Sequence, residues 1–168
     1  MSEIAELLER FRRGAELLAV ATTGAAGPEL DFKPPAAEDK HARWSVRQIV
    51  CHLADAEAIG VMRFRQLIAE ENPSLLGWNQ EAWARSLDYD TRKISQALET
   101  FRILRSQNHE LLKNLPPETF SRAGTHTKRG PMTLLDTLRM YAEHVEKHVR
   151  QLQGVRAAYR EHKTRAAS

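Results

Sequence analysis

Two histidines four residues apart, His144 and His148, have the spacing in this chain that best suits metal chemistry. In a helix this spacing places both imidazoles on one face, with Cβ atoms about 6 Å apart, so that they can share a metal ion. The surrounding sequence, YAEHVEKHVRQL, is not the HExxH motif of thermolysin-type proteases, because Val145 stands where the catalytic glutamate would be. Both histidines border an apolar stripe, so we expect them to face the protein interior.

A third histidine, His52, lies between Ile49 and Ala56 on the apolar side of an earlier helical pattern. A buried neutral imidazole needs a hydrogen-bond partner or a metal. Three histidines from two helices would form a three-nitrogen site with positions open for water or substrate, as in catalytic zinc sites. The residues alone leave a second interpretation open, in which all three are core histidines satisfied by hydrogen bonds.

The chain's other histidines and its cysteine are weaker candidates. Cys51 points about 100° away from His52 on a helix, and we expect a core residue rather than a reactive thiol. A single cysteine excludes an internal disulfide and fits a reducing compartment. The other histidines lie in polar stretches, and we expect surface or loop positions for His41, His109, His126 and His162.

Acidic and aromatic residues near the three histidines have less specific signals. Asp55 and Glu57 flank the His52 turn and could orient a metal ligand, although solvent-exposed acids are commoner on helices. Glu143 should lie on a different helix face from His144, its neighbour in the sequence. We expect Trp78 and Trp83 to serve in packing, and a loop tryptophan can also form the wall of a pocket.

Four long helical patterns, and no convincing strand, position these residues. Ser45 with Gln48 has the spacing of a capping box, and Thr133 with Asp136 has the same cap spacing. The long connection before Ser45 is unusual for a bundle and could close one end of it. Apolar residues at three- and four-residue steps predict helices over residues 2–20, 45–72, 91–114 and 133–152, with a short helix around 81–86.

The bulk composition fits one all-α domain. A chain of 168 residues with 42% hydrophobic and 28% charged residues is typical of a soluble globular protein. We expect a single four-helix bundle over 1–168 with long connections, in the cytoplasm, because no membrane span or signal peptide is evident. Part of the net charge of +3 lies in 156–168, an expected frayed tail. Basic residues on an expected tail, and not clustered on a folded element, do not predict nucleic-acid binding.

Two stretches of the chain resemble the DinB-like family of four-helix proteins. WSVRQIVCHLADAE resembles the start of that family's second helix, and GPMTLLDTLRMYAEHVEKHVRQL resembles its last helix. The segment EENPSLLGWNQEAWARSL is similar to the YfiT branch, whose members carry the provisional name of metal-dependent hydrolases. The resemblance covers a recognisable core of about 44–152.

The resemblance implies a divalent metal, nickel or zinc, held by His52, His144 and His148 and completed by water. It implies a homodimer and a small-molecule substrate, with hydrolysis as the first expected reaction. One departure is that Asn79 and Gln80 stand where the branch usually has an Asp-Glu pair. Amides cannot act as a carboxylate base, so the reaction could be altered.

Two other functions therefore stay open. Members of the wider superfamily add low-molecular-weight thiols such as bacillithiol or glutathione to electrophiles, which makes thiol transfer the rival reaction. A protein that binds a metal or small ligand without catalysis is the other.

Overall fold

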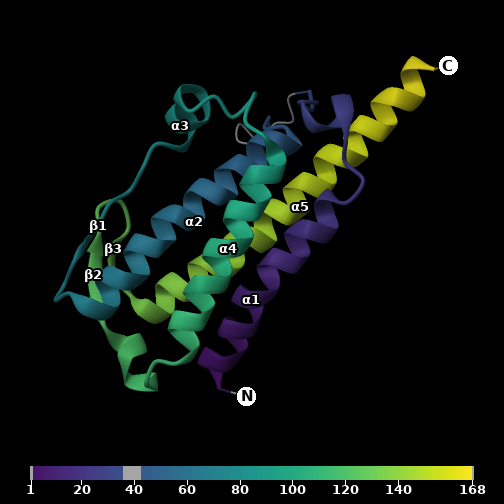
Figure 1. The fold of residues 1–168 in the computed structure, drawn as a ribbon. Coiled ribbons are helices and arrows are strands. Elements are labelled where there is room, and N and C mark those ends of the chain that lie inside the picture. The colour runs from purple at the N-terminus through teal and green to yellow at the C-terminus, as the bar shows by residue number, and fades with distance from the viewer. Residues whose placement is uncertain (1, 36–42, 168) are drawn as a thin grey trace.

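The computed structural model describes residues 2–35 and 43–167, so His41 lies outside the described residues. The expected four-helix bundle is confirmed (Figure 1). The helices are α1 (Glu3–Thr22), α2 (Val46–Ala69), α4 (Ile94–Lys113) and α5 (Leu134–Ala166). Three of these long helices begin one residue after the predicted start, and α4 begins three residues after it.

The order of the helices around the bundle explains its long connections. α1 and α2 each pack against α4 and α5, so the order is α1–α5–α2–α4 (Figure 1). The consecutive long helices α1 and α2 therefore lie across a diagonal, as α4 and α5 do. Each of these connections must cross an end of the bundle. The first contains the 3₁₀ turn η1 (Gly27–Leu30), and the second contains η2 (Pro117–Ser121) and a hairpin.

Side-chain caps fix the starts of the two helices that carry the three histidines. The Ser45 hydroxyl accepts from the Gln48 backbone N–H, and the Gln48 side chain accepts from the Ser45 N–H. Thr133 and Asp136 make the same reciprocal pair before α5. Each box satisfies backbone donors that the helix itself leaves free. The predicted capping boxes are thus confirmed.

A three-stranded sheet, which the sequence analysis did not predict, covers one end of the bundle. β1 (Ser74–Leu75) pairs in parallel with β2 (Ala123–His126), and β2 pairs antiparallel with β3 (Gly130–Thr133). Strands of two to four residues are too short to show a clear alternation. His126 ends β2 and is only 5% exposed. The expectation of a surface position was therefore wrong for His126.

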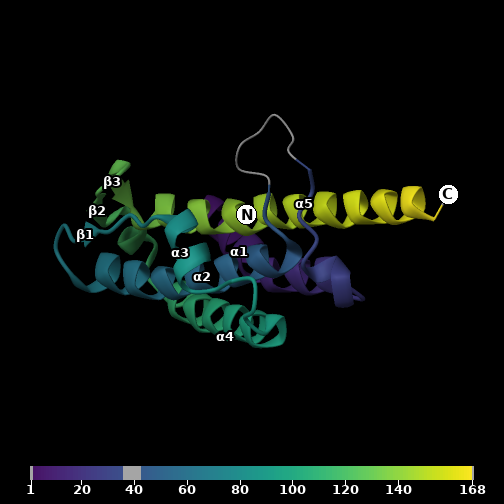
Figure 2. The ribbon, with the colours of Figure 1, turned by 90° about the horizontal axis from the view of Figure 1, so that it is seen from above.

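The short helix α3 (Gln80–Ser86) matches its prediction, whereas the expected frayed tail is helical. α5 continues to Ala166, and its last turns run past the other helices (Figure 2). Arg156 anchors this extension, since it donates to Glu29 at 2.7 Å and to the Ala21 carbonyl at 2.6 Å. Despite its length, α5 lacks the apolar run of a membrane crossing, as do the other helices of the described ranges.

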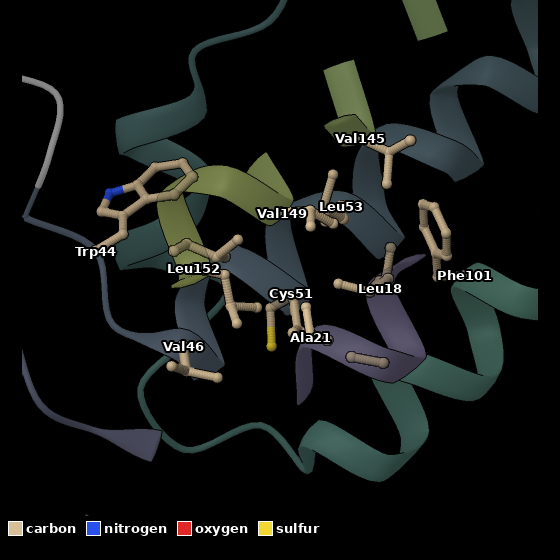
Figure 3. Close-up of a cluster of buried hydrophobic side chains, with 14 of the residues drawn as sticks. Leu18, Ala21, Trp44, Val46, Cys51, Leu53, Phe101, Val145, Val149 and Leu152 are labelled. Atoms are coloured by element: carbon tan, nitrogen blue, oxygen red, sulfur yellow. The ribbon is translucent and has the colours of Figure 1, made fainter. Parts of the chain in front are cut away.

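Two clusters of buried apolar side chains fill the bundle. One surrounds the start of α2 and includes Trp44 and Cys51, which confirms the expected core position of the cysteine (Figure 3). The other includes Phe11 and Phe64, whose rings meet edge to face at 5.7 Å. The three histidines lie beside the first cluster.

A buried ion pair joins the two clusters. Arg105 on α4 donates to the Glu57 carboxylate on α2 at 2.7 Å, and the two side chains are 2% and 1% exposed. The guanidinium also donates to the backbone oxygens of Phe11 on α1 and Tyr141 on α5. It lies over the Phe11 ring at 4.0 Å and the Phe101 ring at 4.8 Å. All four long helices therefore contact one cation.

We expect Glu57→Gln to destabilise the fold by about 3–5 kcal/mol, because it leaves the buried Arg105 charge without its partner. Urea denaturation followed by circular dichroism measures the loss. The control is Arg102→Gln, which breaks an exposed pair with Glu99 on the same helix and should leave the transition midpoint unchanged. Equal midpoints for wild type and Glu57→Gln would contradict the role given to this pair.

Candidate metal centre

The structure brings His52, His144 and His148 together between α2 and α5. Each offers a ring nitrogen, and these three atoms lie within 4.8 Å of one another. The ring centroids are 4.5–5.0 Å apart. His144 and His148 occupy successive turns of α5, and His52 faces them from the adjacent helix. This is the arrangement predicted from the four-residue spacing and the apolar stripes.

The ring nitrogens are disposed as metal ligands would be. Nδ1 of His148 lies 2.8 Å from the Gln151 side-chain oxygen, which can only accept, so Nδ1 carries the proton and Nε2 keeps its lone pair. Nε2 of His52 lies 3.0 Å from Nε2 of His144, and buried Nδ1 of His52 has no partner. Without a metal one of these two Nε2 atoms must carry a proton. A cation would use both lone pairs, and 3.0 Å suits two ligands about 2.1 Å from one ion.

Burial keeps the three imidazoles in the neutral form that metal binding requires. It lowers the pKa of His52 to about 3, and the neighbouring His148 adds to the effect. Burial likewise holds the pKa of His144 well below its ordinary value, with further contributions from His148 and His52. The pKa of His148 is also lowered, again chiefly by burial. At neutral pH no proton competes strongly for these nitrogens.

Two tryptophans enclose the histidine cluster. Trp44 contacts His52 edge to face at 4.9 Å and stacks nearly parallel to His148 at 6.5 Å. Trp78, from the connection after α2, stacks on His52 at 5.3 Å. Apolar walls of this kind exclude water and strengthen electrostatic interactions at the site. Trp78 thus has both roles considered for it, in packing and in lining a pocket.

The acids near His52 do not orient the cluster. Asp55 accepts from Arg92 and from the Tyr89 hydroxyl, and Glu57 belongs to the buried pair with Arg105. The expectation of a solvent-exposed acid was wrong for Glu57, because a cation on another helix compensates its burial. Neither carboxylate hydrogen-bonds a histidine within the described chain.

A cavity of about 480 Å³ lies against the histidine cluster. His144 and Trp78 line the cavity on the side of the histidine cluster, while Asn79, Gln80 and Glu81 come from the start of α3. Its volume falls within the range of small-molecule sites. The opposite wall contains residues that the sequence analysis did not assign to the site: Arg63, His126, Lys128 and Arg129.

One signal for Arg63 is present in the sequence. It stands 11 residues after His52, with Ala56 and Gly60 at the intervening turns, so all four share a helix face. Lys128 and Arg129 gave no such signal, since the β2–β3 turn brings them to the cavity.

Comparison with known proteins decides the family. The sequence profile of the DinB superfamily matches residues 4–152. The chain belongs to the DinB superfamily. Among curated relatives, it is 30% identical over 106 residues to a protein of Oceanobacillus iheyensis and 31% identical over 107 residues to YfiT of Bacillus subtilis. Both carry the provisional name of metal-dependent hydrolase. The aligned stretches cover 63% of this chain and 60–61% of the two relatives.

The solved structure of Bacillus subtilis YfiT has the same fold. It superposes with a TM-score of 0.83 at 24% sequence identity, over 92% of this chain and 87% of that one. YfiT is described there as a probable metal-dependent hydrolase with an unusual four-helix bundle topology. In this chain the consecutive long helices α1 and α2 lie across a diagonal of the bundle, as α4 and α5 do.

We expect the purified protein to retain on the order of one divalent ion per chain after reconstitution, and His148→Ala to lose it. Elemental analysis measures both. The control is His162→Ala, which removes an exposed imidazole near the end of α5 and should keep the metal. Less than about a tenth of an equivalent in wild-type protein would refute the metal centre.

We expect Cys51 to resist alkylation in the native protein and to react once the chain unfolds. The thiol is buried, and burial raises its pKa to about 11, so little of the nucleophilic thiolate forms. Mass spectrometry after iodoacetamide treatment, with and without urea, measures the difference. Equal labelling in both conditions would contradict the core position.

Proposed function

We propose that this protein is a metal-dependent hydrolase of a small molecule, with nickel or zinc held by His52, His144 and His148. The observation that carries the proposal is a cluster of three neutral imidazoles, one of which, His144, lines a cavity of small-molecule size. The provisional names of the relatives agree with it. When bound, such an ion polarises an electrophile and lowers the pKa of a coordinated water or thiol.

The residues around the cavity divide the remaining work. Glu81 is the carboxylate among the cavity-lining residues of the described chain, and it takes the role of proton acceptor. Asn79 caps α3, since its side-chain oxygen accepts from the Ala82 N–H at 3.0 Å. Gln80 can hydrogen-bond a substrate but cannot take up a proton. Trp44 and Trp78 keep water from the metal side.

Thiol transfer is the second candidate, and the Asn79–Gln80 pair favours it. Both amides stand at the cavity where the related branch has acids. A thiol ionises far more readily than water, so its transfer depends less on a protein base. A low-molecular-weight thiol would then be the second substrate. A metal or ligand binder without turnover is the remaining alternative, and a homodimer is the expected assembly.

We expect Glu81→Gln to lower kcat about 10²-fold or more in the metal-loaded enzyme if the reaction is hydrolysis. Metal content should not change, because Glu81 is absent from the histidine cluster. The control is Glu118→Gln, which changes an exposed acid in η2 outside the cavity. This variant should keep full activity. An unchanged kcat in Glu81→Gln would remove Glu81 from the mechanism.

A screen of ester, amide and electrophilic substrates, with and without an added thiol, separates the candidate functions. Turnover without thiol supports hydrolysis, and turnover that requires thiol replaces it with transfer. Loss of turnover in His148→Ala ties either reaction to the metal centre. If no substrate of the panel is turned over by the metal-loaded protein, the result supports a protein that binds a metal or ligand without catalysis.

A further inference from the structure

Arg63 on α2 is a buried cation without a carboxylate partner among the described residues. It is 6% exposed and lines the cavity. It donates to the Leu76 carbonyl at 2.6 Å and to the Tyr141 hydroxyl at 3.4 Å, while buried Nε has no partner. A buried charge is costly unless an opposite charge compensates it. The structure supplies that compensation elsewhere, for Arg105, but not here.

His126 beside Arg63 is held between two hydrogen-bond donors. The Lys128 backbone N–H points at its Nδ1 at 3.1 Å, and the Arg63 guanidinium lies 3.0 Å from its Nε2. A neutral imidazole has one accepting nitrogen, and an imidazolium has none. Whichever nitrogen of His126 carries the proton, one of the two donors, the Lys128 N–H or the Arg63 guanidinium, therefore lacks an acceptor on the ring. Burial and the nearby cations lower the pKa of His126, which keeps the ring neutral.

Two further cations reach the same wall from the β2–β3 turn. The Lys128 stem lies across Gly77 so closely that a Cβ there would meet its Cδ at 2.8 Å. Its ammonium donates to the Trp78 carbonyl at 3.1 Å, at the cavity rim. Arg129 lines the cavity as well. Three cations thus face a single carboxylate, Glu81, among the lining residues.

We propose that this wall of the cavity binds an anionic oxygen group of the substrate, a carboxylate or a phosphate. An oxyanion accepts several hydrogen bonds at once, so it would compensate the buried Arg63 charge and accept from the surplus donor at His126. The guanidinium fork matches the geometry of both groups. The idea that this anion belongs to a substrate rests on the proposed function, whereas the binding itself does not.

The positions of Arg63 and His52 on one helix limit the size of that substrate. Their Cα atoms are separated by about 16 Å along α2, from the helical rise, and side chains lean toward the helix start. Arg63 therefore leans toward the histidines. Ala56 lines the cavity between the two. The expected substrate is a small molecule with an acidic group at one end and the reacting bond at the other.

Isothermal titration calorimetry of the metal-loaded full-length protein tests the proposal, with inorganic phosphate and succinate as separate probes. We expect one or both to bind, and Arg63→Met to weaken binding about tenfold or more, as for loss of a charge-assisted contact. Tighter phosphate than succinate assigns the site to phosphate, and the reverse assigns it to carboxylate. Since Arg63 is buried, metal content and circular dichroism confirm that the variant folds.

A second variant keeps the test decisive if Arg63→Met fails to fold. Lys128→Gln with Arg129→Gln alters two exposed side chains and should also weaken binding about tenfold, because two cations leave the wall. Its matched control is Arg13→Gln with Lys163→Gln, the same charge change at exposed positions outside the cavity, with affinity unchanged. Binding equal in both double variants, or no binding of either probe to wild type, would overturn the proposal.

The metal centre and the anion site can fail separately. His148→Ala should lose the metal and keep its affinity for the anion, because the cationic wall does not include His148. Loss of anion binding in His148→Ala would mean that the probe binds the metal, and would overturn the proposal. The proposal would also be overturned if His148→Ala lost the metal while the Arg63 and Lys128 variants kept wild-type affinity for the anion.

Discussion

The buried Arg105–Glu57 pair is the interaction on which the relative positions of the helices depend. Two charges removed from water are tolerated only while each keeps its partner and its further hydrogen bonds. Glu57 also accepts from Asn108, and Arg105 also donates to the backbone of α1 and α5. A sliding of any helix would break one of these contacts. Since Glu57 lies five residues after His52, the pair also fixes the height of His52 along α5.

Close helix contacts around this pair require particular residues. A Cβ at Gly14 would lie 2.6 Å from Val145 and 3.1 Å from the Arg105 guanidinium. A Cβ at Gly60 would lie 2.8 Å from the Tyr141 ring. Val145 and Tyr141 lie one and three residues from His144 on α5. Both glycines therefore allow α5 to pack closely beside the histidine cluster.

Much of the candidate metal centre could be predicted from the sequence because its signals are local. Capping boxes and apolar periodicity depend on residues within a few turns, and they placed both helices that carry the three histidines and their inward faces. The residues that were missed depend on tertiary contacts. Arg105 resembles any charged residue of an amphipathic helix until Glu57 faces it. His126 is buried only because β2 pairs with β1 and β3, and such short strands leave no pattern.

The cavity results from a difference in side-chain size along one face of α2. His52 and Arg63 are large and polar, whereas Ala56 and Gly60 between them are small. Ala56 lines the cavity, whereas the Tyr141 ring packs against Gly60. The cavity lies between His144 of the histidine cluster and a cluster of cations. A metal at one end and an anion at the other would hold a ligand in one direction only. Substrate orientation would then follow from charge, while the uncharged residues between the ends set the length that fits.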